Sequence, residues 1–231
     1  MKKDRLKKLA GENQFGRDNR LRLKHEKEDR PMSEWKMVGK PGLILIHMQH
    51  AITHEAGRLA FVGHAKATKE SGIIHRQQSL LKAFRAKKLP VIYVNAVTDP
   101  KATFSPYGKF YPVIKTSGVN LPGSKDIEVI EDVAPQPGEP VLGNWIFGIF
   151  SNSGLEKVLK EKGVTTLVLA GVATDMAVLT SVVQAADLGY DQIVPSDAST
   201  SANPTAHDAA MNIMIPAMAL VTPTDDVIAH L

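Results

Sequence analysis

The sequence contains no cysteine among its 231 residues. This chain therefore forms no disulfide bond, and no thiolate can serve it as a nucleophile or metal ligand. Long apolar runs are also missing, because no stretch reaches the roughly 18 consecutive apolar residues of a membrane-spanning helix. The first residues are charged and lack the apolar segment of a secretory signal. We therefore expect a cytoplasmic protein with no membrane partner.

Positive charge is concentrated in one part of the chain. Residues 1–30 hold eleven lysines and arginines and six acidic residues, which leaves 17 of the 28 basic and 18 of the 24 acidic residues for the rest. The net charge of +4 thus belongs to an N-terminal arm, residues 1–38. A nucleic-acid-binding domain needs a basic face on its folded body, so we expect no nucleic-acid partner. We interpret the arm as a solvated segment or one that packs against a partner.

Residues 39–231 alternate between short apolar runs and segments of helical periodicity, which is typical of a parallel sheet covered on both faces. We therefore predict one domain with a Rossmann-like, three-layer α/β/α fold and a central, mainly parallel sheet of about six strands. The predicted strands are 43–46, 91–94, 139–142, 166–170, 192–195 and 218–221, and the predicted helices are 66–88, 153–162, 174–188 and 204–214.

The segment 165–190 combines a strand, a tight turn and a helix. Its apolar run, Leu167–Ala170, predicts a strand buried on both faces, and Gly171 ends that run. Thr174 and Asp175 are residue types that often begin helices. Such a turn directs backbone N–H groups and a helix N-terminus towards one point. The segment is therefore suited to stabilising a developing negative charge.

This segment resembles the signature of the isochorismatase-like hydrolases, also called the cysteine hydrolase superfamily. Four other pieces agree in the same order: GLILIHMQ at 42–49, SLLKAFRAKKLPVIYV at 79–94, APQPGEPVL at 134–142 and SDAST at 196–200. With the late His207, the resemblance covers residues 40–230. It implies a small-molecule substrate and assembly of the chain into a homo-oligomer, a dimer or a tetramer.

The resemblance also implies a catalytic triad of Asp, Lys and Cys, and this sequence departs from it at all three matching positions. His47 stands at the Asp position, Asn144 at the Lys position and Ala177 at the Cys position. A methyl group cannot attack a carbonyl carbon, so thioester catalysis is excluded at Ala177. His47 can still transfer protons near neutral pH, and Asn144 can hold a carbonyl or a hydroxyl group.

Two backbone N–H groups complete the site that the resemblance implies. They belong to Ala173 and Ala177 and would bind an anion, with a cis peptide between Val172 and Ala173. The side chains that we expect to bind substrate are Gln49, Asn95, Tyr107, Trp145 and Thr174.

Histidines at 47, 50 and 54 have a spacing found in metal sites, but also in surface loops. Nicotinamidases of the family carry an Asp-x-His metal motif after the second strand, and the corresponding residues 95–99 contain no histidine. We therefore expect neither a metal nor another cofactor.

Three functions remain open. The first is a divergent enzyme of the family that acts on a small polar substrate, with a carbonyl, amide or enol-ether group, through His47 as acid or base. The second is a catalytically inactive protein of the same fold that binds a small molecule. The third is a protein that binds a partner through its basic arm.

Overall fold

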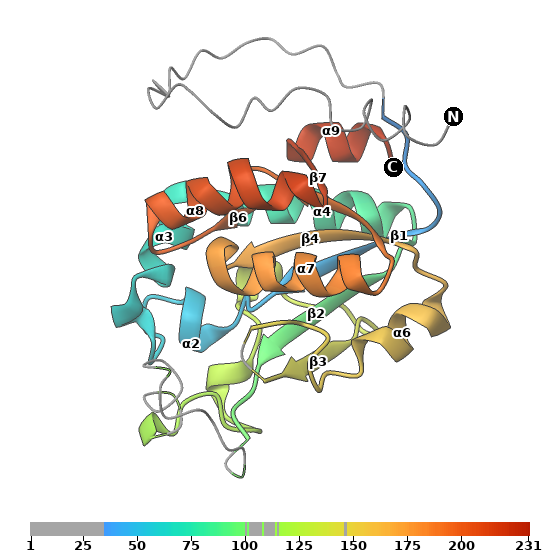
Figure 1. Ribbon diagram of the computed structural model, residues 1–231. Helices are drawn as coiled ribbons and strands as arrows, with labels where there is room; N and C mark the ends of the chain where they lie inside the picture. The colour runs from blue at the N-terminus through green and yellow to red at the C-terminus, as the bar shows by residue number, and fades with distance from the viewer. Residues whose placement is uncertain (1–34, 100, 102–107, 109–113, 115, 146) are drawn as a thin grey trace, which may run out of the picture. The chain divides into compact units, whose positions relative to one another are not determined.

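The computed structural model describes residues 35–99, 101, 108, 114, 116–145 and 147–231 (Figure 1). Residues Trp35–Leu231 form one compact unit. The predicted division into an arm, 1–38, and a domain, 39–231, stays a prediction, since most of the arm lies outside the described residues. In the described ranges, no helix is both long and apolar enough to cross a lipid bilayer.

Seven strands form one sheet in the order β3-β2-β1-β4-β5-β7, and the short β6 pairs with β4 beside this path. Each pair of neighbouring strands is parallel, which confirms the predicted fold class. The strands are β1 Pro41–Ile46, β2 Val91–Ala96, β3 Val141–Asn144, β4 Thr166–Val172, β5 Asp191–Pro195, β6 Ser199–Thr200 and β7 Leu220–Thr222.

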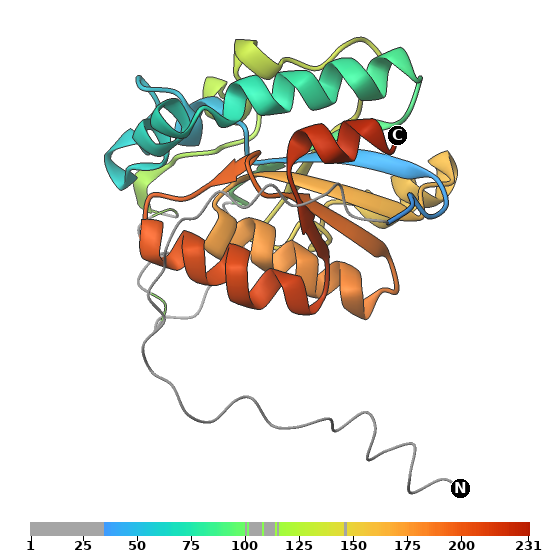
Figure 2. The ribbon, with the colours of Figure 1, turned by 90° about the horizontal axis from the view of Figure 1, so that it is seen from above.

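The two central strands, β1 and β4, are apolar apart from Thr166 because helices cover both faces of the sheet. All six residues of β1 and all seven of β4 are buried. Their side chains alternate between two cores: Ile44 and Ile46 point to one, and Leu43 and Leu45 to the other. Helices α6, α7 and η5 pack on the first side, and α4 and α9 on the second, as Figure 2 shows from above.

The helical elements alternate with the strands along the chain. The α-helices are α2 His50–Thr53, α3 His64–Ser71, α4 Ile73–Ala86, α6 Leu155–Lys162, α7 Leu179–Asp187, α8 Pro204–Ala209 and α9 Thr224–Ala229. The 3-10 turns are η1 Ala60–Val62, η2 Lys125–Ile127, η3 Glu131–Val133 and η6 Ile215–Ala217. The π-helical turns are η4 Thr174–Val178 and η5 Ala210–Met214.

Several predicted boundaries need correction. The helix predicted over 66–88 is two helices, α3 and α4, because Gly72 adopts a left-handed conformation with φ +72° and ends the first. The strand predicted over 139–142 begins only at Val141, after Pro140, and continues to Asn144. Helices 174–188 and 204–214 each contain a π-helical turn, and both β6 and α9 lie where no element was predicted.

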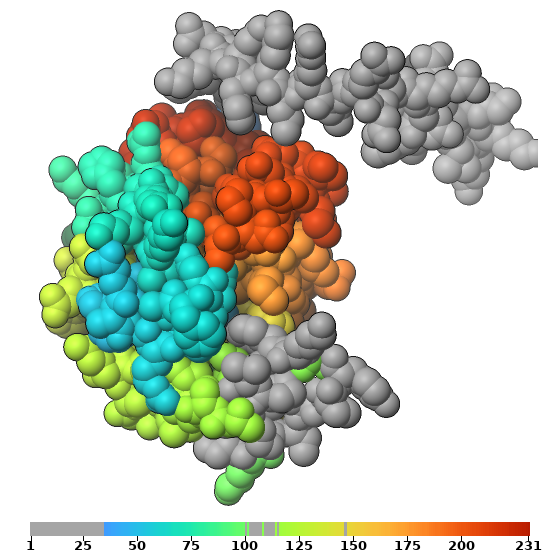
Figure 3. Space-filling model, turned by 90° about the vertical axis from the view of Figure 1, so that its left-hand side faces the viewer, coloured from blue at the N-terminus to red at the C-terminus, as the bar shows by residue number. Residues whose placement is uncertain are grey.

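The carboxyl ends of the parallel strands meet at one edge of the sheet, where ligands bind in open α/β folds. Figure 3 faces this side, with atoms of α3 next to those of the segment that leads into α8. A hydrogen bond joins the two segments, since the Ala202 N–H donates to Nδ1 of His64 over 3.2 Å. The edge is therefore closed from one side by the start of α3.

Candidate active site

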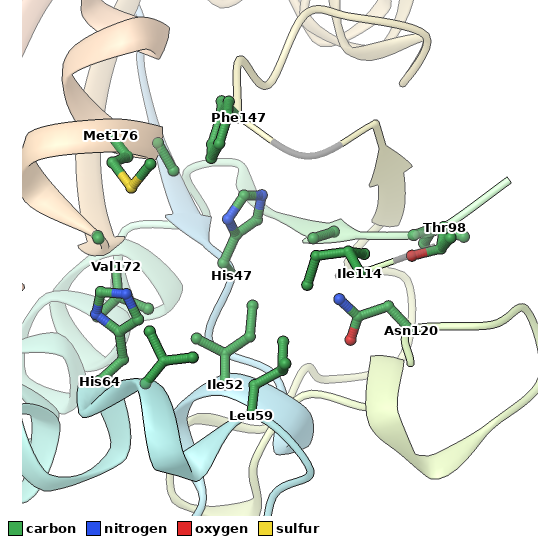
Figure 4. A pocket seen from close by; sticks show the side chains of 15 residues that line it. His47, Ile52, Leu59, His64, Thr98, Ile114, Asn120, Phe147, Val172 and Met176 are labelled. Carbon is green, nitrogen blue, oxygen red and sulfur yellow. The ribbon is translucent and has the colours of Figure 1, made fainter. Parts of the chain in front are cut away.

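A cavity of about 160 Å³ opens at the carboxyl ends of β1, β2 and β4 (Figure 4). Its lining is mostly aliphatic and aromatic, and the polar side chains among the described residues are uncharged amides, hydroxyls and imidazoles. The lining residues are His47, Ile52, Leu59, Val62, His64, Ala96, Val97, Thr98, Ile114, Asn120, Phe147, Val172, Ala173, Met176 and Ala177.

His47 lies at the centre of this cavity, immediately after β1. Its backbone has a φ of +52°, which is uncommon for a residue with a side chain. Its N–H donates to the carbonyl oxygen of Val94 over 2.8 Å, so the turn is tied to β2. The side chain is 4 % exposed and projects into the cavity between β1 and the end of β3.

His47 and Asn144 form a hydrogen-bonded pair across the end of β2. The distance between His47 Nε2 and Asn144 Oδ1 is 2.9 Å. Asn144 Nδ2 donates to the Gly148 carbonyl oxygen over 3.1 Å, so Oδ1 is the atom that faces the imidazole. An amide oxygen only accepts, and Nε2 of His47 therefore carries the proton. The other ring nitrogen, Nδ1, is left with a lone pair.

Burial controls the charge of His47. Removal from water lowers its pKa to about 4, against the opposing effect of the Asn144 hydrogen bond and with a smaller contribution from nearby His64. The imidazole is therefore neutral at physiological pH. Nδ1 can accept a proton or a hydrogen bond in that state.

The turn after β4 forms the neighbouring wall of the cavity. A Cβ atom at Gly171, whose φ is +134°, would lie 2.1 Å from the Ile46 carbonyl oxygen, so only glycine fits between β4 and β1. The peptide between Val172 and Ala173 is cis, the form that the resemblance to the family implies. Ala173 and Ala177 both line the cavity beside His47. The turn thus places both alanines beside the cavity, and anion binding by their N–H groups stays a prediction.

His64 is a cavity residue that the sequence analysis did not identify. It is the first residue of α3, and Gly63, with a φ of +103°, precedes it. Burial lowers the pKa of His64, while the carboxylate of Asp175 acts in the opposite direction. A single histidine at a helix start, far in sequence from every quoted motif, has no pattern that would mark it.

Two predicted substrate-binding residues lie behind the cavity rather than in its lining. Gln49 is fully buried; its Nε2 donates to the Ala96 and Asp126 carbonyl oxygens and to Oδ1 of Asn120, and its Oε1 accepts from the Ala96 N–H. Asn95 donates to the Ile127 carbonyl oxygen over 2.9 Å. Their role in binding substrate stays a prediction, and these bonds fix the wall that carries Asn120.

The remaining predicted residues lie in different places. Thr174 is buried at the start of η4, with its hydroxyl 2.9 Å from Nδ1 of His207. Trp145 is 42 % exposed and is not part of the lining. Tyr107 lies outside the described residues. Substrate binding by these three residues stays a prediction.

The described ranges contain no group of three or more His, Cys, Asp or Glu side chains that could hold a metal ion. His50 and His54 stack on each other with their ring centroids 4.3 Å apart, and neither lines the cavity beside His47. The three histidines of the candidate metal spacing are therefore divided between two locations.

Known proteins are similar to this chain in sequence. Ureidoacrylate amidohydrolase RutB from Methylobacterium radiotolerans is 29% identical over 183 residues, which cover 73% of this chain and 70% of that protein. The enzyme of the same name from Pseudomonas savastanoi pv. phaseolicola is 26% identical over 179 residues, with 72% and 73% covered.

Solved structures agree with the sequence relatives. A cysteine hydrolase from Pseudomonas syringae pv. phaseolicola has a TM-score of 0.74 at 22% identity, covering 88% of this chain and 98% of that one, and shows the same fold. N-carbamoylsarcosine amidase from Thermoplasma acidophilum has a TM-score of 0.64 at 28% identity, covering 80% and 97%. The isochorismatase domain matches residues 41–226 of this chain, and the chain therefore belongs to the isochorismatase family.

Proposed function

We propose that this protein is a hydrolase of the isochorismatase family that activates water instead of a thiol. In this proposal His47 is the acid and base, Asn144 orients it, and the N–H groups of Ala173 and Ala177 bind the developing anion. The substrate is a small molecule with a carbonyl or amide group. The observation that carries the proposal is the 2.9 Å bond between His47 Nε2 and Asn144 Oδ1, which leaves Nδ1 available in the cavity.

The proposed reaction needs one proton carrier. His47 Nδ1 takes a proton from water while the water oxygen forms a bond to the carbonyl carbon, and the carbonyl electrons move to its oxygen. The N–H groups of Ala173 and Ala177 stabilise that oxyanion. When the oxyanion collapses, the bond to the leaving group breaks, and protonated His47 returns its proton to the leaving atom. Each proton and electron pair is thus accounted for without a covalent enzyme intermediate.

The environment of His47 supports this role in one respect and limits it in another. Its pKa of about 4 keeps the ring in the basic form at neutral pH. A general base is most effective when its pKa lies near the working pH. A base with a pKa of about 4 therefore gives a modest rate at neutral pH. We expect activity to fall as the pH drops through about 4 and to stay level above it, as long as no other group titrates.

The test is hydrolysis of a panel of small amides and esters, with p-nitrophenyl acetate as the activated member, in ¹⁸O-labelled water. His47→Gln keeps hydrogen bonding but cannot carry the proton, and it should lower kcat/KM by about 10²–10⁴-fold. His75→Gln, at an exposed position on α4, is the matched control and should leave the rate unchanged. Equal rates in wild type and His47→Gln would refute the assignment of the base.

The low pKa of His47 also favours a second candidate, a protein that binds a small molecule without converting it. In that case wild type and His47→Gln would both bind ligand and neither would show turnover above the rate in buffer. Binding through the basic arm is the third possibility left by the sequence, and loss of function on removal of residues 1–34 would support it.

A further inference from the structure

The cavity contains a second imidazole, and its orientation is defined by the backbone around it. His64 Nδ1 accepts a hydrogen bond from the Ala202 N–H over 3.2 Å. A neutral imidazole has one donor and one acceptor nitrogen. Because Nδ1 accepts, Nε2 of His64 carries the proton. Among the described residues, no atom accepts a hydrogen bond from this Nε2–H.

His47 and His64 therefore offer opposite hydrogen-bonding groups to one cavity (Figure 4). His47 Nε2 is engaged by Asn144, so its Nδ1 is an acceptor. His64 provides a donor through Nε2–H. Ile52 and Val172, which line the same cavity, are apolar. A ligand that satisfies both imidazoles needs one donor group and one acceptor group on a largely apolar body.

We propose that His64 is a ligand-binding residue of this cavity, and that His47 and His64 together select small uncharged molecules carrying one hydrogen-bond donor and one acceptor over carboxylates of the same shape. This inference rests on the proposed function for the position of the substrate, and adds the class of molecule that the cavity accepts.

The charges around the cavity support selection against anions. The described lining contains no Lys or Arg side chain that could pair with a carboxylate. Burial keeps both imidazoles neutral near pH 7 by lowering their pKa values. The carboxylate of Asp175 acts on His64 electrostatically and would repel a second negative charge. The N–H groups of Ala173 and Ala177 would offer a carboxylate only partial positive charges, so burying a full negative charge here is less favourable than burying a neutral group.

The volume of the cavity limits the ligand to about one ring. An apolar protein cavity on the order of 150 Å³ holds benzene, and this one measures about 160 Å³. Met176 is 37 % exposed and lines the cavity, so it lies where the cavity meets solvent. A substituent larger than an amide or a nitro group would have to project past this residue.

Three compounds of nearly equal shape test the proposal by calorimetry or ligand-observed NMR at pH 7.5. Benzamide is neutral and has a donor and an acceptor, nitrobenzene is neutral and has acceptors only, and benzoate is anionic. We expect benzamide to bind at least about tenfold more tightly than nitrobenzene, the value of one hydrogen bond of about 1.4 kcal/mol. Benzoate should bind more weakly than either. Equal affinity for benzamide and benzoate would overturn the selection for uncharged ligands.

Variants of His64 separate its role from that of the fold. His64→Leu removes the donor and should weaken benzamide about 5–15-fold, while His64→Gln keeps an N–H donor and should stay within about threefold of wild type. Toluene has no polar atom and should bind to wild type and His64→Leu alike, which shows that the cavity remains intact. Unchanged benzamide affinity in His64→Leu, with toluene still bound, would refute the role of His64.

A gain of function at the cavity mouth completes the test. Met176→Lys places a cation beside the opening and should raise benzoate affinity relative to benzamide by about tenfold, whereas Met176→Leu should not change the ratio. These measurements need no turnover. Loss of hydrolysis with benzamide selectivity retained would therefore refute the proposed reaction alone, and loss of selectivity in a protein that still hydrolyses its substrate would refute this inference alone.

Discussion

At the scale of single residues, burial of His47 links the stability of the protein to pH. The folded pKa is about 4 and the ordinary value is 6.5, so between these values the unfolded chain binds more protons. Stability is therefore fully present above about pH 6.5 and decreases as the pH falls towards 4. The difference between these two pKa values corresponds to about 3 kcal/mol in the free energy of unfolding.

Urea unfolding of wild type and His47→Gln at pH 7 and pH 5 tests this link. Wild type should lose about 2 kcal/mol more than His47→Gln over this interval. The comparison cancels the contribution of His64, which titrates in the same direction in both proteins. Parallel losses in the two proteins would show that His47 is not buried in its neutral form.

A thiol introduced at Ala177 tests whether this residue faces the cavity. Ala177 is 2 % exposed but lines the cavity, while Ala185, a residue of α7, is fully buried in the core. Iodoacetamide should label Ala177→Cys and leave Ala185→Cys unmodified in the folded protein. Wild type has no cysteine and should not react. Faster labelling of Ala185→Cys would contradict the position of the η4 turn.

The sequence allowed part of this site to be predicted. His47, Asn144 and Ala177 follow from the resemblance to the family, because each stands within or beside a quoted motif. Their contact does not follow, because residues 47 and 144 lie 97 positions apart and meet only through the strand order β3-β2-β1. His64 reaches the cavity through the turn at Gly63 and the bond to Ala202, two features without a sequence pattern.

At the scale of elements, the close approach of β4 to β1 depends on Gly171. Replacement by alanine places Cβ 2.1 Å from the Ile46 carbonyl oxygen and also imposes an unfavourable φ of +134°. Gly72→Ala is the matched control, since its φ is +72° and no atom lies within 4 Å of the added Cβ. We expect Gly72→Ala to cost about 1 kcal/mol and Gly171→Ala more than about 3 kcal/mol.

Thermal or urea unfolding measures both variants. If Gly171→Ala costs no more than Gly72→Ala, the two strands are further apart at this point than described. Gly171→Ala should also weaken benzamide binding, whereas Gly72→Ala should not. The close contact at Gly171 comes directly before Val172 and Ala173, which line the cavity.

The strands were easier to predict than the helices. Runs such as 43–46 and 91–94 are apolar without interruption because the sheet is covered on both faces. This pattern can be recognised in the sequence alone. The boundary between α3 and α4 depends on one glycine within a helical pattern, and glycine is tolerated inside helices as well as at their ends. The short β6 has only two residues, and its pairing with β4 is a tertiary contact.

At the scale of the whole molecule, Trp35 connects the beginning of the described chain to its C-terminal segment through two contacts. Its Nε1 donates to Oδ2 of Asp226 over 2.8 Å, and its ring stacks on His230 with a centroid distance of 4.2 Å. The Thr222 hydroxyl donates to the same carboxylate. Trp35 thus packs against α9 and the residue that follows this helix.

Trp35→Phe should lower the free energy of unfolding by about 1–2 kcal/mol, because the carboxylate of Asp226 is only 9 % exposed and loses a donor. Trp145→Phe, at a position that is 42 % exposed, should change it by less than about 0.5 kcal/mol. Denaturant titration of the two variants provides the comparison. Equal effects would mean that the Trp35 contact adds nothing to stability.

Assembly into a dimer or tetramer stays a prediction, and sedimentation of the full chain and of a chain that begins at Trp35 measures it. The shorter chain should fold, since Trp35–Leu231 is a compact unit. A smaller species after truncation would assign assembly to the arm, and an unchanged species would assign it to the domain.

The Trp35 contact also gives the protein a built-in optical signal. The chain has two tryptophans, so Trp145→Phe leaves one indole, and that indole lies against an imidazole. Because the indole of Trp35 stacks on the imidazole ring of His230, its emission should change when the two rings separate. A fluorimeter can therefore follow the opening of this junction without any attached dye.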